Sequence, residues 1–241
     1  MTEVNEKFSL GGIDIFVSKD HRFGTDAFLL ADFAAPLPNH TVCDLCTGCG
    51  IIPLLFCREK PPRKVYGIDI SEEAIELFQN SVRHNGLSDR VTPLLCDLKD
   101  ISVIERESCD IVTVNPPYFK KDSGGLKLSP AQAAARTELL CNINDVTMAA
   151  AKLLKYGGSL KMCHIPARLS DVVCAMRAAG IEPKLLQFVV KKQGEKPWLF
   201  LISGKRGAKP GMDILPQLAV YDENMEYTEQ IKKMYLIKDV T

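Results

Sequence analysis

The residues best suited to chemistry form the tetrapeptide Asn115-Pro116-Pro117-Tyr118, which follows an apolar run over residues 110–114. That run is typical of a buried strand, and it must stop at Asn115 because neither proline can donate an N–H to a sheet ladder. Since proline favours extended geometry in the preceding residue, we expect the Asn115 amide and the Pro116 carbonyl to face one small space. Two acceptors beside the Tyr118 ring would suit a planar NH2 group. On its own the tetrapeptide is also typical of a stiff turn, so its context decides.

Polar residues end four consecutive predicted strands, at Asp44, Asp69, Asp97 and Asn115. In open α/β sheets, ligands bind outside the carboxyl ends of the strands, at a topological switch point. One such residue alone is typical of a solvated strand end. Four in succession indicate a ligand-binding crevice.

A glycine-rich turn, residues 45–50, follows Asp44 and would bring backbone N–H groups close to a ligand. A dinucleotide-binding turn requires Gly-x-Gly-x-x-Gly, but Pro53 occupies the third glycine position. Asp69 lies nineteen residues after the last glycine of the turn, where an acid can accept both ribose hydroxyls. Asp97 can accept from an adenine amino group. Without a pyrophosphate element, this combination predicts a nucleoside lacking phosphates, and S-adenosylmethionine is the leading candidate.

Strands and helices alternate along the middle of the chain, which predicts an α/β fold with a parallel, doubly wound sheet. We expect a hairpin at residues 8–17, strands at 42–45, 65–68, 91–95, 110–114, 159–164, 185–190 and 198–202, and helices at 27–33, 51–58, 146–154 and 167–179. A further helix is expected between a cap at Ser71 and a stop at Asn85-Gly86. Thr25 or Asp26 is expected to cap the first helix, and Gly157-Gly158 to close the helix before the fifth strand.

The composition is that of an ordinary globular protein, with 241 residues, 46% hydrophobic and 25% charged. We expect a single domain over residues 1–241, with an N-terminal extension (1–40), a core (41–205) and a C-terminal tail (206–241). Lys+Arg and Asp+Glu number 30 each, so the net charge is zero. The whole molecule is therefore not expected to attract nucleic acid, although local basic patches remain open.

The nine cysteines are scattered, and the sequence shows neither a signal peptide nor an apolar run of membrane-spanning length. This favours reduced thiols in a cytoplasmic protein with no membrane partner. Cys43, Cys46 and Cys49 lack a second Cys or His pair at a ligand spacing, so we expect no metal. The four histidines are typical of ordinary loop or strand-end residues. The oligomeric state stays open between a monomer and a weak dimer.

Asp44–Gly50, Asp69, Asp97 and Asn115–Tyr118 resemble the successive motifs of class I S-adenosylmethionine-dependent methyltransferases. Within these, Asn-Pro-Pro-Tyr resembles the subgroup that methylates exocyclic amines of nucleobases or glutamine amides. Three more segments resemble the bacterial tRNA1(Val) adenine-N6-methyltransferase family, and the similarity covers roughly the whole chain. These segments are Phe23-Gly24-Thr25-Asp26-Ala27, Ala135-Arg136-Thr137-Glu138, and Tyr221 with Glu226-Tyr227-Thr228-Glu229.

The resemblance implies a Rossmann-like, doubly wound sheet that is mostly parallel with a C-terminal antiparallel hairpin. It also implies methyl transfer from S-adenosylmethionine to the N6 amine of a tRNA adenine next to the anticodon. By position it implies cofactor binding by Thr25, Asp26, Asp44, Cys46, Gly48, Asp69, Ile70, Asp97, Leu98 and Asn115. It implies catalysis by Asn115, Pro116 and Tyr118, and substrate binding by Tyr118, Phe119, Lys120, Lys121, Arg136, Lys191 and Lys192. Cys46 departs from the family pattern, which more often has glycine there.

Basic residues cluster in two places. Residues 191–209 contain six basic side chains against the single acid Glu195, and Lys120, Lys121 and Lys127 follow the Asn-Pro-Pro-Tyr loop. Such clusters suit phosphate contacts, and they also suit a solubilising surface.

Other functions stay open. The acceptor pair serves any exocyclic amine, so rRNA guanine-N2 methylation is an alternative. Release-factor glutamine-N5 methyltransferases resemble the core motifs equally well, but they carry a helical N-terminal domain, and about forty residues precede the first core strand here. A non-catalytic cofactor-binding protein would not need the acceptors of Asn115–Tyr118, and Pro53 disfavours a dinucleotide oxidoreductase.

Overall fold

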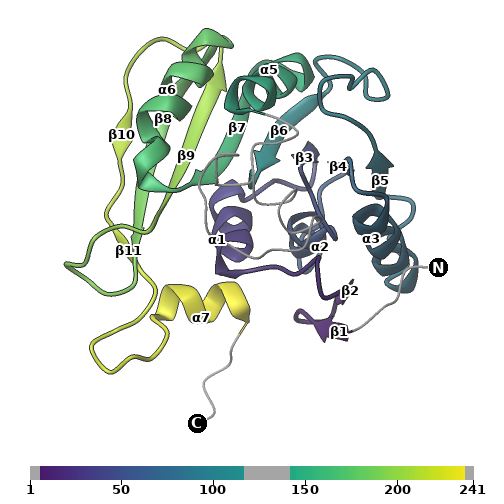
Figure 1. Ribbon diagram of the computed structural model, residues 1–241, viewed down its shortest axis with the longest axis horizontal. Helices are drawn as coiled ribbons and strands as arrows, with labels where there is room; N and C mark the ends of the chain where they lie inside the picture. The colour runs from purple at the N-terminus through teal and green to yellow at the C-terminus, as the bar shows by residue number, and fades with distance from the viewer. Residues whose placement is uncertain (1–5, 117–141, 237–241) are drawn as a thin grey trace.

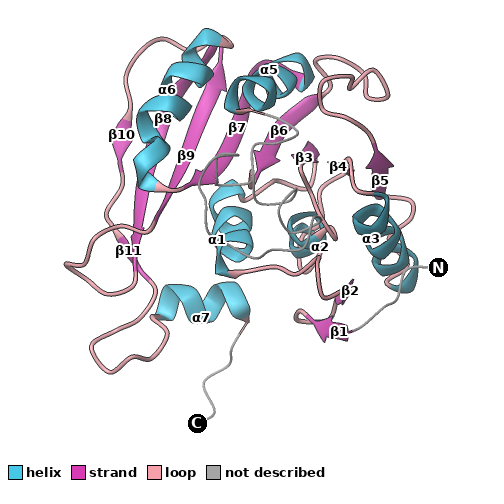
Figure 2. Cartoon of the chain, viewed as in Figure 1, coloured by secondary structure: helices cyan, strands magenta, loops and turns pink. Residues whose placement is uncertain are grey.

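The computed structural model describes residues 6–116 and 142–236 (Figure 1). In chain order, its elements are β1 (Glu6–Ser9), β2 (Asp14–Val17), α1 (Thr25–Ala34), β3 (Thr41–Leu45), α2 (Ile51–Phe56), β4 (Lys64–Asp69), α3 (Glu72–His84), β5 (Val91–Leu95), β6 (Cys109–Val114), α5 (Ile143–Leu153), β7 (Leu154–His164), a 3₁₀ turn (Pro166–Arg168), α6 (Leu169–Ala178), β8 (Ile181–Val190), β9 (Leu199–Arg206), β10 (Asp213–Ile214), β11 (Leu218–Ala219) and α7 (Glu229–Tyr235). Figure 2 shows helices and strands alternating through the middle of the chain, as the sequence predicts.

Nine strands form one sheet in the order β10-β8-β9-β7-β6-β3-β4-β5, with β11 also paired to β8. Within the described part of this sheet, β9 runs antiparallel to both β7 and β8, whereas the other pairs are parallel. This confirms the predicted Rossmann-like sheet with an antiparallel hairpin near its C-terminal edge. All the parallel strands therefore end at the same edge of the sheet.

Alternate residues of the central strands are buried on opposite faces, because side chains alternate along a strand. Val42, Val65 and Ile111 pack with α1, α2, α3 and α7. Cys43 and Val112 pack with α5 and α6 on the other face. Both faces of the sheet are thus covered, which explains why the strands read as continuous apolar runs.

The topological switch point lies between β3 and β6. After β3 the chain builds β4 and β5 on one side, and then returns to place β6 on the other. Asp44 of β3 is directly opposite Thr113 of β6 in the register. Ligands bind at such a point in sheets of this kind, and Asn115 follows β6 there.

Two local predictions were wrong. The N-cap of α1 is Gly24, with no side-chain hydrogen bond, so neither Thr25 nor Asp26 is the cap. Gly157 and Gly158 do not close a helix but lie inside β7, which begins directly after α5. A Cβ on Gly158 would lie 3.1 Å from the Cys109 carbonyl oxygen of β6, and the pairing of the two strands shifts register here. These glycines serve a bulge and a close approach of two backbones.

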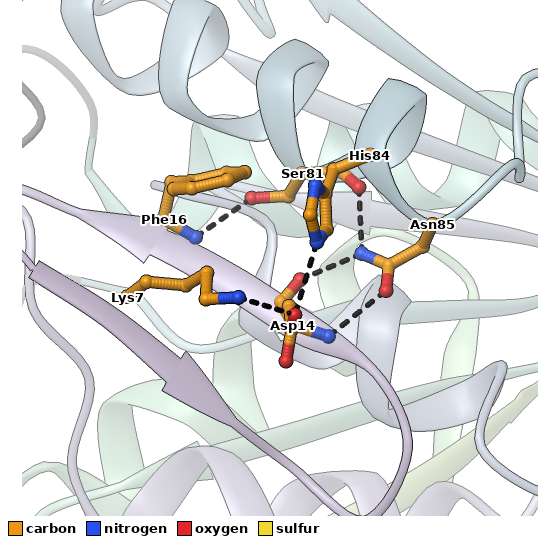
Figure 3. A network of polar contacts seen from close by, with 6 residues as sticks. All are labelled: Lys7, Asp14, Phe16, Ser81, His84 and Asn85. Atoms are coloured by element: carbon orange, nitrogen blue, oxygen red, sulfur yellow. Dashed lines mark hydrogen bonds and ion pairs between the residues drawn. The ribbon is translucent and has the colours of Figure 1, made fainter.

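The N-terminal hairpin of β1 and β2 is attached to α3 by side chains that cap and face it (Figure 3). Asn85 holds Asp14 on both sides: Asp14 N donates to Asn85 Oδ1 at 2.9 Å, and Asn85 Nδ2 donates to the Asp14 carbonyl at 2.6 Å. Phe16 N donates to Ser81 Oγ at 2.9 Å. The Asp14 carboxylate accepts from Lys7 and His84, which lowers the pKa of Asp14. The hydrogen bonds between the hairpin and α3 therefore involve mainly backbone groups of β2.

Asn85→Ala is expected to lower the free energy of unfolding by about 2 kcal/mol, because it leaves partly buried backbone groups of Asp14 without partners. Chemical denaturation measures the change. His84→Ala is the control, since it removes an exposed pair with Asp14 and a ring contact with Phe16 but leaves the backbone groups of Asp14 paired, and it should have a smaller effect. An Asn85→Ala variant as stable as the wild type would show that the hairpin does not depend on this side chain.

Candidate active site

Asn115 directly follows Val114, the last residue of β6. Its Nδ2 donates to Asp26 Oδ2 at 2.8 Å, and its Oδ1 accepts from the Cys163 thiol at 3.2 Å. Asp26 is in the first turn of α1, and Cys163 is next to the last residue of β7. Three segments far apart in the sequence therefore meet at this amide.

These two contacts fix the direction of the Asn115 amide. An ionised carboxylate only accepts hydrogen bonds, so the NH2 half of the amide faces Asp26 and the oxygen half faces Cys163. An amide oxygen can accept two hydrogen bonds, and a thiol is a weak donor. Asn115 Oδ1 is thus an oriented acceptor at the carboxyl edge of the sheet.

Asp44 is fully buried near the end of β3. Its Oδ1 accepts from the Thr113 hydroxyl at 2.5 Å, whereas Oδ2 has no hydrogen-bond partner within the described residues. Burial raises the pKa of Asp44 to about 7, and the nearby hydroxyls of Thr113 and Thr47 oppose the rise. Burying a carboxylate oxygen without a hydrogen-bond donor costs free energy. An ammonium group is a suitable donor because it carries the opposite charge. This oxygen fits the amino group of S-adenosylmethionine, the predicted cofactor.

The Phe78 ring leaves no room for a side chain at two glycines, one in the turn after β3 and one in β4. A Cβ on Gly50 would lie 2.0 Å from the Phe78 ring, and one on Gly67 of β4 would lie 2.5 Å from it. Gly48, at φ +56°, borders open space. Cys46 also has φ 56°, a left-handed conformation that favours glycine. Cys46, where the family more often has glycine, therefore has a strained backbone. The Cys46 side chain packs against the face of the sheet that α5 and α6 cover.

Asp69 ends β4 and accepts a hydrogen bond with each carboxylate oxygen. Oδ2 accepts from Gly48 N at 2.8 Å, and Oδ1 accepts from Ser71 N at 2.9 Å. Asp69 therefore ties the glycine turn to the start of α3. Each carboxylate oxygen can accept a second hydrogen bond, so the ribose hydroxyls predicted here remain suitable partners.

The residues that follow β4 and β5 include apolar side chains beside an acid. Ile70 follows Asp69 and is 49% exposed, while Leu98 is buried. Asp97 is exposed, and its Oδ1 accepts from Lys99 N at 2.9 Å. Cys96 N donates to the Asp69 carbonyl at 2.9 Å, which brings the two strand ends together. An adenine ring needs such a flat apolar contact with an acceptor nearby.

The structure divides the basic cluster of residues 191–209 between two edges of the sheet. Lys191 and Lys192 follow the carboxyl end of β8, at the same edge as Asn115. Lys205 and Arg206 end β9, which runs the other way, and Arg206 pairs there with Glu107 at 2.7 Å. The six basic residues of this segment therefore do not all lie at the edge that carries Asn115.

Several predicted site residues lie outside the described residues, namely Tyr118, Phe119, Lys120, Lys121 and Arg136. Pro116 is described and is buried. In the described part of the chain, no helix is long and apolar enough to cross a membrane. Over the same residues, no three His, Cys, Asp or Glu side chains are grouped as metal ligands.

Sequence reasoning missed three residues at the site: Thr113, Cys163 and Tyr235. Thr113 is a polar residue among the buried apolar residues 111–114 of β6, and that residue type could have marked it. Cys163 looks like any other small apolar residue of a strand. The Tyr235 hydroxyl donates to Thr25 Oγ1 at 3.1 Å across 210 positions of sequence, a contact with no local signal.

Comparisons with known proteins agree with this architecture. A family model described as a methyltransferase domain matches residues 37–197. A tRNA1(Val) (adenine(37)-N6)-methyltransferase from Histophilus somni is 24% identical, over 88% of this chain and 88% of its own. A ribosomal protein uL3 glutamine methyltransferase from Bradyrhizobium diazoefficiens is 32% identical, over 50% of this chain and 36% of its own. The crystal structure of a predicted O-methyltransferase from Agrobacterium tumefaciens matches with a TM-score of 0.70 and 19% identity, covering 88% of this chain and 95% of that one.

The matched region contains β3, β4 and β6, and with them Asp44, Asp69 and Asn115. The Agrobacterium structure, which covers 88% of this chain, has the same overall fold. The resemblance inferred from the motifs is thereby confirmed. The chain belongs to the methyltransferase domain family.

Proposed function

We propose that this protein transfers a methyl group from S-adenosylmethionine to the exocyclic N6 amine of an adenine in tRNA. By its resemblance, the target is the adenine next to the anticodon of tRNA1(Val). The observation that carries the proposal is the Asn115 amide, oriented between Asp26 and Cys163 at the switch point. The Histophilus somni relative, which carries this activity in its name and matches 88% of both chains, supports the substrate.

The proposed chemistry depends on hydrogen-bond acceptors. An exocyclic amine is a weak nucleophile because its lone pair is delocalised into the ring. Acceptors on its two hydrogens favour a more pyramidal nitrogen and stabilise the positive charge that develops on it. Asn115 Oδ1 is one acceptor, and we assign the Pro116 carbonyl as the other. S-adenosylmethionine, when bound, supplies a methyl group that is already activated.

Asp26 strengthens this acceptor. Its carboxylate accepts from Asn115 Nδ2, and hydrogen bonds that share one amide polarise each other, so Oδ1 becomes a better acceptor. The amine can release its proton to water after transfer, and the chain need not supply a strong base. Placement of the nitrogen in line with the methyl group then accounts for most of the rate.

For the cofactor we propose three groups of contacts. Thr25, Asp44, Cys46 and Gly48 surround its methionine part, Asp69 holds its ribose, and Ile70, Asp97 and Leu98 surround its adenine. The Asp44 oxygen without a partner and the apolar Ile70 side chain support the first and third of these. The hydrogen-bonded pair of Asp26 and Asn115 would lie next to the methionine part of the cofactor.

For the RNA we propose contacts by Lys191 and Lys192. Three inter-strand steps separate β8 from β6, so these lysines lie about 14 Å along the edge from Asn115. One RNA can contact both places while its target base reaches the amide. Tyr118, Phe119, Lys120, Lys121 and Arg136 remain proposed contacts from the sequence. A tRNA substrate would place the protein in the cytoplasm.

The second candidate function is methylation of a glutamine amide in protein. The uL3 glutamine methyltransferase relative favours it, because an amide NH2 fits the same acceptors. That similarity covers only 36% of the relative, whereas the tRNA methyltransferase relative is covered over 88%. Guanine-N2 methylation of rRNA is the remaining alternative from the shared chemistry.

The test is transfer of labelled methyl groups from S-adenosylmethionine to unmodified total tRNA, ribosomal RNA, release factor and ribosomal protein uL3, with Asn115→Ala as the control. We expect label in tRNA, recovered as N6-methyladenosine and lost in the variant. Label recovered as N2-methylguanosine in ribosomal RNA, or as methylglutamine in either protein, would overturn the proposed substrate and keep the site. Absence of label from all four, with cofactor bound, would overturn the proposal.

A further inference from the structure

The segment around Tyr221 and Tyr227, singled out in the sequence for its resemblance, has no part in the chemistry above. It forms a closed turn, in which Tyr221 and Tyr227 are bridge partners and Asp222 N donates to the Glu226 carbonyl at 2.9 Å. Thr228 follows as the N-cap of α7. The turn therefore fixes where α7 begins and which way it runs.

A column of half-buried tyrosine rings connects this turn to the buried Phe28 of α1. Tyr221 stacks on Tyr227 with ring centroids 5.3 Å apart, and Tyr227 stacks on Tyr235 at 5.5 Å. Tyr235 stacks on Phe28 of α1 at 4.2 Å, so that α7 lies beside α1 (Figure 1). Stacked rings add specific geometry to ordinary apolar burial. The column holds α7 against the first turns of α1.

The Tyr235 hydroxyl reaches the first residue of α1. It donates to Thr25 Oγ1 at 3.1 Å, and the next residue, Asp26, accepts from Asn115. Gly24 has no side chain with which to cap this turn. Burial raises the pKa of Tyr235, and the Asp26 carboxylate nearby adds to the rise, so the hydroxyl stays a neutral donor.

We propose that Tyr235 is a positioning residue of the methyl-transfer site, whose ring and hydroxyl hold the first turn of α1 so that Asp26 stays on Asn115. The inference rests on the proposed function, in which Asn115 Oδ1 accepts from the target amine. In this proposal the aromatic residues near the C-terminus position α1 and do not contact the RNA.

Steady-state methyl transfer to tRNA tests the role. Tyr235→Ala is expected to lower kcat by up to about 10²-fold, because a displacement of about 1 Å at a reacting group has effects of this size. KM for tRNA should change less than about threefold. Tyr235→Phe, which keeps the stack and loses the hydroxyl, should recover most of the rate. Tyr221→Ala removes a ring of the same column without touching α1 and should lose far less than Tyr235→Ala.

Amide hydrogen exchange tests the same inference in the cofactor-free protein, without any substrate. Tyr235→Ala should speed exchange in the first turns of α1, at residues 27–31, while α3 exchanges as in the wild type. Wild-type protein that fails to methylate tRNA would defeat the proposed function, and the exchange result would still decide the role of Tyr235. Unchanged exchange in α1, or an equal loss of kcat and of Tm in Tyr235→Ala and Tyr221→Ala, would overturn the inference.

Discussion

Asn115→Ala is expected to lower kcat for methyl transfer by roughly 10²–10³-fold, the usual effect of removing one preorganised group that stabilises developing charge. The amide contributes an acceptor that matters most when the amine nitrogen becomes positive, so the rate should fall more than tRNA affinity. Single-turnover transfer of labelled methyl measures the loss. A variant that keeps its rate would show that Asn115 does not contact the amine.

A swap of the two side chains tests whether Asp26 orients Asn115. Asn115→Asp alone places two carboxylates where Nδ2 and Oδ2 now lie 2.8 Å apart, and like charges at that distance repel. Asp26→Asn alone leaves two amides that can pair in either direction. The double variant restores one donor and one acceptor, with a carboxylate oxygen presented to the amine. We expect it to recover at least about tenfold of the rate lost by Asn115→Asp. Failure to recover would leave Asp26 without a positioning role.

The strand ends that the sequence marked do meet in space. Asp44, Asp69 and Asn115 each follow or end an apolar run, and parallel strands bring such ends to one edge. This part was predictable because it depends on local pattern and on a general rule for sheets. The Gly50 turn was predicted for its approach to a ligand, and the Phe78 ring behind it explains that glycine equally well.

Contacts between distant segments could not be predicted in this way. Asp26 carries no local sign that it will meet Asn115, 89 residues later, and the same is true of Tyr235 and Thr25. These pairs depend on how α1 and α7 pack on the sheet, which is a property of the whole fold. The predicted cap at Thr25 or Asp26 was wrong because α1 already begins at Thr25, directly after Gly24.

The structure divides the basic cluster for a geometric reason. Lys192 and Lys205 are close in sequence, but β9 separates them, and eight strand residues span about 25 Å. A strand carries neighbouring charges to opposite edges of the sheet, whereas a loop would have kept them together. A cluster of charges along a sequence therefore indicates a charged surface only once the direction of the strands between those charges is known.

Asp44→Asn is expected to stabilise the cofactor-free protein at pH 8. The pKa of the Asp44 carboxyl is 3.8 in the unfolded chain, and burial raises it to about 7 in the folded protein. The folded state therefore holds its proton to higher pH, so the free energy of unfolding falls as the pH rises from about 4 to 7 and stays low above pH 7. The shift corresponds to roughly 4 kcal/mol. The new amide keeps the Thr113 hydrogen bond but buries an unpaired NH2, which costs about 1–3 kcal/mol, leaving a net gain of about 1–3 kcal/mol. Chemical denaturation at pH 5 and pH 8 should show a smaller gain at the lower pH.

The same substitution is expected to weaken S-adenosylmethionine binding by about 10- to 100-fold at pH 8, since a charge-assisted hydrogen bond to the ammonium group is lost. Calorimetry should show that wild-type affinity declines from pH 8 to pH 6, as Asp44 takes up a proton, and that Asp44→Asn removes this dependence. Thr113→Val is the matched control: it keeps the charge, removes the opposing hydrogen bond, and should move the pH dependence upward. If Asp44→Asn raises the free energy of unfolding and weakens S-adenosylmethionine binding, the buried Asp44 carboxylate lowers stability in order to bind the cofactor. Wild-type affinity in Asp44→Asn would instead make the buried carboxylate a structural cost unrelated to the cofactor.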